Sequence, residues 1–131
     1  MTELIYKDEY YRIVECAIKV WKTLGYGFLE KVYENALAIE LRKNGFDVQQ
    51  QVPVKVHYES DIVGEYIVDI QVNGEIVVEV KTCKAVANEH RSQTLNYLKA
   101  TGKPVCLLIN FGKARIDIKR FSSHDGPGQA G

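Results

Sequence analysis

Two carboxylates and a lysine in the middle of the chain interrupt runs that are otherwise typical of buried strands. Asp69 lies in the run IVDI, and Glu79 and Lys81 lie in VVEVK. Residues two apart on a strand share a face and stand about 6.6 Å apart, so Glu79 and Lys81 point the same way. Two carboxylates that converge there would bind a hard cation, Mg²⁺ or Mn²⁺, which prefers oxygen ligands. Lys81 beside that cation would complete a site for metal-assisted hydrolysis of a phosphodiester.

The turn between these two strands decides whether Asp69 joins the site, because opposed residues of an antiparallel pair point to one face. A two-residue turn at Asn73-Gly74 would turn Asp69 away from Glu79. A three-residue loop, Val72-Asn73-Gly74 with Gly74 left-handed, places Asp69 opposite Val77 and on the face of Glu79. The functional hypothesis therefore predicts a loop with an odd number of residues between these two strands. The alternative is a solvated sheet face on which the carboxylates pair loosely with Lys81.

Hydrophobic periodicity predicts helices over residues 10–24, 29–41 and 88–100 and strands over 52–58, 65–72, 76–81, 105–111 and 114–121. Ser60-Asp61 and Gly64 are expected to form the turn between the first two strands. The order predicts one domain over residues 1–121, an α/β sandwich around a mixed sheet that contains an antiparallel three-strand meander. Residues 122–131 are rich in Gly, Ser and Pro and are expected to form a flexible tail.

The composition sets limits on function. The 131 residues are 46% hydrophobic, which is typical of a globular domain. Lys plus Arg and Asp plus Glu number 17 each, so a nucleic-acid partner would need a local basic patch. The start of the chain lacks a signal-peptide pattern, and no apolar run is long enough for a membrane span. Three widely spaced cysteines favour a reducing compartment, so a cytoplasmic protein without a membrane partner is expected.

Several ordered motifs resemble one known family. The segment GFLEKVY, residues 27–33, has the pattern G-x-x-E-x-x-Y, and GEYIVDIQVNGEIVVEVK, HRSQTLNYL and LLINFG follow in order. Together they resemble the GxxExxY family, which is placed in the PD-(D/E)xK nuclease superfamily, from about residue 25 to 121. The resemblance implies a restriction-endonuclease-like fold, whose core order of helix, meander, helix and strand matches the order predicted from periodicity.

The resemblance also implies roles for individual residues. Asp69 takes the place of the motif's Asp and Glu79-Val80-Lys81 that of E-x-K, with the Val80 carbonyl as a further metal ligand. Many members add a glutamate from the first core helix, and here either Glu30 or Glu34 could serve. The alternative for each glutamate is an exposed helix flank.

The helix over residues 88–100 carries a polar stripe, because His90, Gln93 and Tyr97 are spaced i, i+3 and i+7. Gln93 to Tyr97 resembles the Q-x-x-x-Y motif of RecB-like nucleases, which implies a role in positioning substrate; the alternative is that Tyr97 belongs to the core. Basic side chains that could contact phosphate are Lys84, Arg91, Lys99, Lys103, Lys113, Arg115, Lys119 and Arg120.

These observations lead to two main hypotheses about function, beside a third in which the chain has a structural or subunit-interface role and Asp69 and Glu79 face solvent. The first is a Mg²⁺- or Mn²⁺-dependent nuclease, acting on DNA rather than RNA, with Asp69 and Glu79 as ligands and Lys81 as the catalytic cation. The second is a non-catalytic module that keeps the fold and binds nucleic acid or a protein. A homodimer or a protein partner would be compatible with either hypothesis, because nuclease domains of this kind often need a partner or a second copy to hold the substrate.

Overall fold

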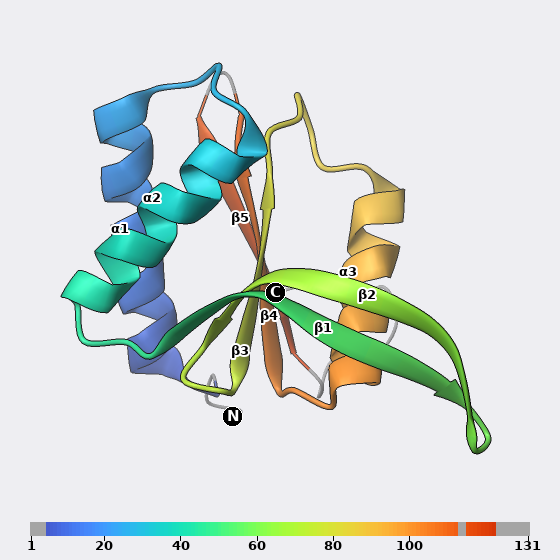
Figure 1. Cartoon of the computed structure of the whole chain (residues 1–131). Helices are drawn as coiled ribbons and strands as arrows, with labels where there is room; N and C mark the ends of the chain where they lie inside the picture. The colour runs from blue at the N-terminus through green and yellow to red at the C-terminus, as the bar shows by residue number, and fades with distance from the viewer. Residues whose placement is uncertain (1–4, 113–114, 123–131) are drawn as a thin grey trace, which may run out of the picture.

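The computed structural model describes residues 5–112 and 115–122. The helices are α1 (Lys7–Leu24), α2 (Glu30–Lys43) and α3 (Asn88–Thr101). The strands are β1 (Val48–Tyr58), β2 (Asp61–Val72), β3 (Ile76–Lys81), β4 (Val105–Phe111) and β5 (Ile116–Ser122). Figure 1 shows their arrangement.

The five strands form one mixed sheet in the order β1-β2-β3-β4-β5. Every neighbouring pair is antiparallel except β3 and β4, which are parallel and are connected through α3. Parallel neighbours need such a crossover, whereas the meander β1-β2-β3 needs only short turns. The predicted mixed sheet with an antiparallel three-strand meander is confirmed.

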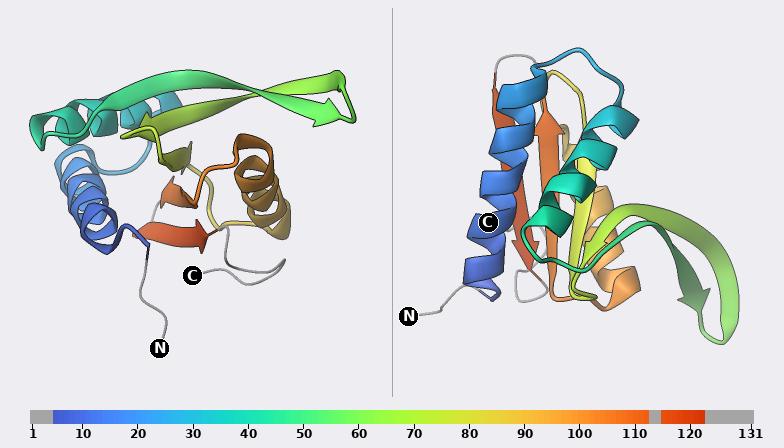
Figure 2. Two further views of the ribbon diagram at one scale, coloured as in Figure 1. Left: turned by 90° about the horizontal axis from the view of Figure 1, so that it is seen from below. Right: turned by 60° about the vertical axis from the view of Figure 1, so that its left-hand side comes forward.

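Helices cover both faces of the sheet (Figure 2). One cluster of buried side chains lies between the sheet and the pair α1 and α2, and it includes Ile13, Leu37, Ile70, Val78 and Val80. A second cluster lies on the α3 side and includes Val68, Val77, Tyr97, Leu98 and Cys106. Strand β4 is buried along its whole length, because helices cover it on both faces.

The loop between α1 and α2 fixes α2 on the sheet. Gly25 ends α1 with a left-handed φ of 72°, and its N–H donates to the carbonyl of Trp21 at 2.8 Å. The hydroxyl of Tyr33 donates to the carbonyl of Gly25 at 2.5 Å, and the Tyr33 ring stacks on Phe111 of β4 with centroids 4.7 Å apart. Tyr33, the last residue of the G-x-x-E-x-x-Y pattern, therefore has a structural role.

The first two strands are longer than predicted. Strand β1 begins at Val48 rather than residue 52, and β2 begins at Asp61 rather than residue 65. The predicted turn is wrong: the turn is Glu59-Ser60, Tyr58 pairs with Asp61, and Gly64 lies inside β2 opposite Val56. Two features hid these extensions: residues 49–51 are all polar, and Asp61 and Gly64 are turn-forming types.

The structure differs from the prediction at the C-terminal end of β5. Ser122, predicted to begin the tail, is the buried last residue of β5, and the predicted tail from 123 to 131 lies outside the described residues, as does Ala114. Across the ranges 5–112 and 115–122, no helix is long and apolar enough to cross a membrane.

Candidate active site

The candidate site lies in a fork where β2 separates from β3. The pairs Ile70–Val78, Gln71–Val77 and Val72–Ile76 join the two strands, and their pairing ends there. Strand β3 continues alone beside β4 through Glu79, Val80 and Lys81. Asp69, the next residue of β2, and Glu79, the next residue of β3, therefore stand at the base of the fork.

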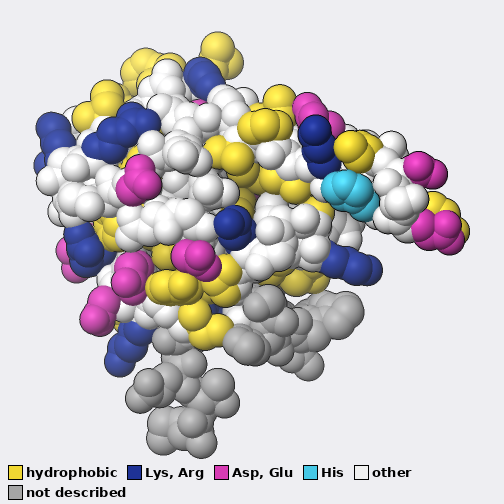
Figure 3. Space-filling view, turned by 60° about the horizontal axis from the view of Figure 1, so that its bottom comes forward, with side chains coloured by type: hydrophobic (Ala, Val, Ile, Leu, Met, Phe, Trp, Pro, Cys, Tyr) yellow, Lys and Arg dark blue, Asp and Glu magenta, His cyan; other side chains and the backbone are white. Residues whose placement is uncertain are grey.

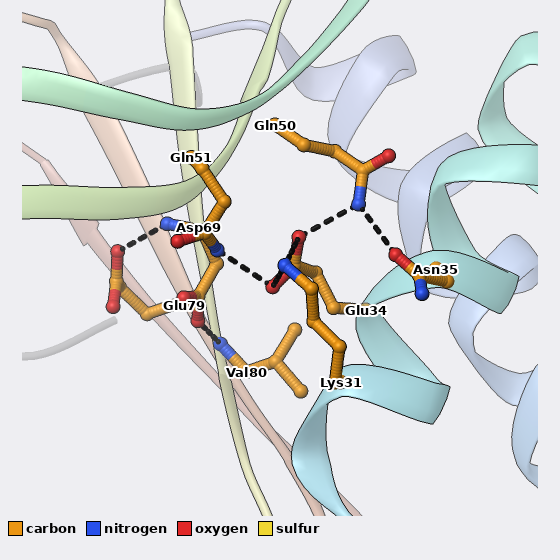
Figure 4. A network of polar contacts seen from close by, with 8 residues as sticks. All are labelled: Lys31, Glu34, Asn35, Gln50, Gln51, Asp69, Glu79 and Val80. Carbon is orange, nitrogen blue, oxygen red and sulfur yellow. Dashed lines mark hydrogen bonds and ion pairs between the residues drawn. The ribbon is translucent and has the colours of Figure 1, made fainter.

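Side chains replace the backbone ladder at this point (Figure 4). The N–H of Asp69 donates to Glu79 Oε1 at 3.1 Å, and the N–H of Val80 donates to Asp69 Oδ2 at 2.8 Å. Since the N–H and C=O of one strand residue point the same way, the Val80 carbonyl also faces the fork. Asp69 and Glu79 thus tie the two strands together where the backbone pairing ends.

The loop between β2 and β3 has an odd number of residues, as the functional hypothesis predicted, but it starts at a different residue. It is Asn73-Gly74-Glu75, with φ of 52° at Asn73 and 70° at Gly74. The left-handed Gly74 and the shared face of Asp69 and Glu79 agree with the prediction. The predicted partner is wrong, because Val77 pairs with Gln71 rather than with Asp69. Two left-handed residues in succession start the loop one residue later than expected.

Strand β1 changes faces beside the site. Gln51 lies across from Asp69 and has a left-handed φ of 55°. Before it, the Gln50 side chain reaches α2; after it, Val52 packs on the α3 side. Strand β2 switches in the same place, since Ile70 and Val68 belong to opposite cores. The site is therefore at the point where the β1–β2 pair crosses from one helical layer to the other.

Burial and mutual repulsion dominate the electrostatics of the two carboxylates. Glu79 is 4% exposed, and burial, followed by the negative charge of Asp69, raises its pKa to about 8. Burial also raises the pKa of Asp69, against the lowering effect of the hydrogen bond from Val80. The charge of Lys81 lowers the pKa of both carboxyls, but it does not cancel the burial. In the metal-free protein, Glu79 therefore holds its proton to a higher pH than an ordinary glutamate does.

The two candidate helix glutamates have different surroundings. Glu34 is 3% exposed and faces the fork, where its charge raises the pKa of Asp69 and of Glu79. Glu34 accepts hydrogen bonds from Gln50 at 2.7 Å and Gln51 at 2.8 Å, and Lys31 pairs with it at 3.3 Å. Glu30, which fits the sequence pattern, is exposed one turn earlier. The geometry thus favours Glu34 as the helix carboxylate.

The sequence analysis did not predict the residues that fix the positions of Glu34 and of the chain beside Lys81. Gln50 and Gln51 hold Glu34, and the polar run at 49–51 before the apolar alternation was the available signal. Asn110 is 2% exposed and exchanges two hydrogen bonds with the backbone of Cys83, at 3.0 and 2.9 Å. Asn110 lies beside Lys81 in the parallel register, so this clamp fixes the chain just beyond the lysine.

Of the three residues in the polar stripe on α3, Tyr97 is the one on which the charges of the two carboxylates act. Tyr97 is buried, and burial, followed by the charges of Glu79 and Asp69, raises its pKa to about 12. His90 Nδ1 accepts a hydrogen bond from the N–H of Ala87 at 3.1 Å, so this side chain caps α3. Gln93 is exposed. Tyr97 therefore lies within the electrostatic reach of the carboxylates, and His90 has a structural contact.

The basic residues predicted to contact phosphate are scattered. Arg120 is wrong as a candidate, because it is 6% exposed and donates to the carbonyl of Ile5. Lys119 pairs with Asp117 at 3.6 Å, and Lys113 lies outside the described residues. Lys99 is exposed on α3.

A divalent cation fits the fork as a partly hydrated ion. Within the described ranges, no group of three or more His, Cys, Asp or Glu side chains is placed to hold a metal ion. Mg²⁺ does not need such a group, since one or two carboxylates, waters and substrate phosphates are its usual ligands. Burial first, and neighbouring carboxylates second, raise the pKa of Glu79 and Asp69, and a bound cation would favour the ionised form of both groups. Asp69, Glu79 and the Val80 carbonyl are the groups that would hold it.

This fold and site define a nuclease-type domain, and comparison with known proteins agrees. The chain belongs to the PD-(D/E)xK nuclease superfamily, whose model matches residues 7–121. No curated protein matches the chain.

Two solved structures share the fold. The crystal structure of SSO0001 is similar with a TM-score of 0.57 and 18% identity, over 89% of this chain and 60% of that chain. The alkaline exonuclease LHK-Exo from Laribacter hongkongensis is similar with a TM-score of 0.52 and 14% identity, over 93% of this chain and 72% of that chain. The chain thus spans less than two thirds of the length of the first of these structures.

Proposed function

We propose that this protein is a metal-dependent nuclease that hydrolyses phosphodiester bonds of nucleic acid, with DNA favoured over RNA. The proposal rests on the fork, where Asp69 and Glu79 are hydrogen-bonded across the two strands beside Val80, and where Lys81 follows on the same face of β3 as Glu79. Membership of the nuclease superfamily and the shared fold of an alkaline exonuclease support it. The motifs quoted above lead us to propose the GxxExxY group within that superfamily.

Each residue has a distinct part in this proposal. A Mg²⁺ or Mn²⁺ ion held by Asp69, Glu79 and the Val80 carbonyl would supply Lewis-acid stabilisation of the charge on the phosphate. Lys81 positions the attacking water and balances charge while the bond from phosphorus to the leaving oxygen breaks. Glu34 adds negative charge from α2 and orders the β1 side of the site through its glutamine partners.

The three free cysteines, two of them buried, lead us to propose a reducing compartment such as the cytoplasm.

A cleavage assay with a matched lysine control tests the proposal. Labelled single-stranded DNA, duplex DNA and RNA are incubated with Mg²⁺, Mn²⁺ or EDTA. We expect cleavage that EDTA abolishes and that Lys81→Ala lowers by about 100-fold or more, the scale of a lost acid–base or charge-stabilising group. Lys43→Ala, an exposed lysine at the end of α2, should cleave like the wild type. Cleavage that survives Lys81→Ala, Asp69→Asn and Glu79→Gln would contradict the proposal.

A further inference from the structure

The β1–β2 hairpin extends well beyond the body of the domain. We call residues 52–68 the arm. Figure 1 shows it curving past α3 and ending free of the other strands. Val52 and Val54 anchor its base on the α3-side core, whereas residues 61–67 are exposed. A hairpin of this length is not needed for the core, so its projecting part is available for contacts with a ligand.

A groove of about 560 Å³ lies between the arm and α3. The arm contributes Lys55, His57 and Tyr66 to it, and α3 contributes Asn96, Lys99 and Ala100. Among the described residues, its lining includes two lysines and a histidine and no carboxylate. In the space-filling view, basic, acidic and histidine side chains lie along the arm, and further acidic side chains lie at its tip (Figure 3). In a chain with no net charge, the groove has the local basic lining that a polyanion requires.

Aromatic rings connect the groove to the carboxylates. Tyr66 lies at the wall of the groove and is 42% exposed. Its ring meets Tyr97 edge-on, with centroids 5.4 Å apart, and the charges of Glu79 and Asp69 act on Tyr97. Tyr66 is also three residues before Asp69 on β2. Tyr66 therefore belongs to the wall of the groove and stands about 10 Å along β2 from Asp69.

We propose that this groove binds an unpaired strand of nucleic acid and feeds it to the fork, so that the substrate is a single-stranded segment or end. The inference rests on the proposed nuclease function and names its substrate class. A groove of this size holds about one or two nucleotides. Lysines that track phosphates together with an aromatic platform for a base are the usual combination for single strands. A paired base is already stacked in its duplex and cannot use the face of Tyr66.

Binding in EDTA tests the inference apart from cleavage. Fluorescence anisotropy is measured with a labelled oligothymidylate of about twelve nucleotides, its abasic analogue and a duplex of equal length. The double variant Lys55→Ala/Lys99→Ala should weaken oligothymidylate binding at least about tenfold, and should lower the slope of log K against log salt by about 1.4, two lost single-strand phosphate contacts. Tyr66→Leu should weaken binding of the oligothymidylate about tenfold while leaving the abasic analogue unchanged.

The controls make each outcome decisive. Lys43→Ala, on the opposite helical layer, should bind like the wild type. Duplex binding as tight as single-strand binding, or an affinity unchanged in the double variant, would overturn the inference. Failure to hydrolyse any phosphodiester while these binding results hold would overturn the proposed nuclease function instead.

Discussion

Asp69 and Glu79 are each hydrogen-bonded to the strand that carries the other. The N–H of Asp69 donates to Glu79, and the N–H of Val80, next to Glu79, donates to Asp69. These side-chain bonds close the sheet at the point where the backbone ladder between β2 and β3 ends. The same two carboxylates are therefore both structural ties and, in the proposed mechanism, metal ligands. The two roles can be separated by conservative variants.

Metal-free stability should fall as pH rises, because of Glu79. Its pKa is about 8 in the folded protein and 4.5 in its ordinary state, so the folded protein binds more protons between these values. The contribution of Glu79 to the free energy of unfolding should be largest below pH 4.5 and should decline as the pH rises to about 8. The raised pKa of Asp69 acts in the same direction.

Glu79→Gln tests this pH dependence, because glutamine keeps the acceptor for the Asp69 N–H and cannot ionise. Urea unfolding in EDTA should show the variant more stable than the wild type at pH 8, with the difference vanishing near pH 4.5. A stability difference between the two proteins that does not grow from pH 4.5 to 8 would show that the pKa of Glu79 is not raised in the folded state.

The two helix glutamates should differ in their effect on metal binding. Glu34→Gln removes a buried negative charge beside Asp69 and Glu79 and should weaken Mn²⁺ binding about tenfold, the usual scale for a group behind the ligands. Glu30→Gln changes an exposed residue on the same helix and should alter it less than twofold. Titration of both variants with Mn²⁺ gives the comparison. The reverse order would assign the helix carboxylate to Glu30.

Gly112 should not tolerate a side chain. A Cβ at this position would lie 3.0 Å from the carbonyl oxygen of Cys83, in the segment that Asn110 clamps behind Lys81. Gly112→Ala should cost about 1–3 kcal/mol in urea unfolding, since backbone must move. Gly64→Ala is the matched control: nothing lies within 4 Å, and alanine in a strand should be neutral or stabilising by up to about 1 kcal/mol. Equal effects would mean that the Gly112 contact relaxes freely.

The parts of the fold that local pattern determines were predictable. Strands β3 and β4 have the predicted bounds, because their apolar runs end at clear breaks. The shared face of Asp69 and Glu79 followed from the parity of a loop. The left-handed conformation of Gln51 was not predictable, since a glutamine carries no signal for positive φ. Nor was the choice between Glu34 and Glu30, because both lie on one side of α2 and only its packing on the sheet separates them.

The most direct test of the central claim is calorimetric titration of the intact chain with Mg²⁺ and Mn²⁺, beside Asp69→Asn and Glu79→Gln. Both substitutions keep side-chain shape and remove one anionic ligand each. We expect a single site in the wild type that is lost in both variants, while circular dichroism shows that each variant is folded. Metal binding that is absent from the wild type, or equal in all three proteins, would contradict the proposed site.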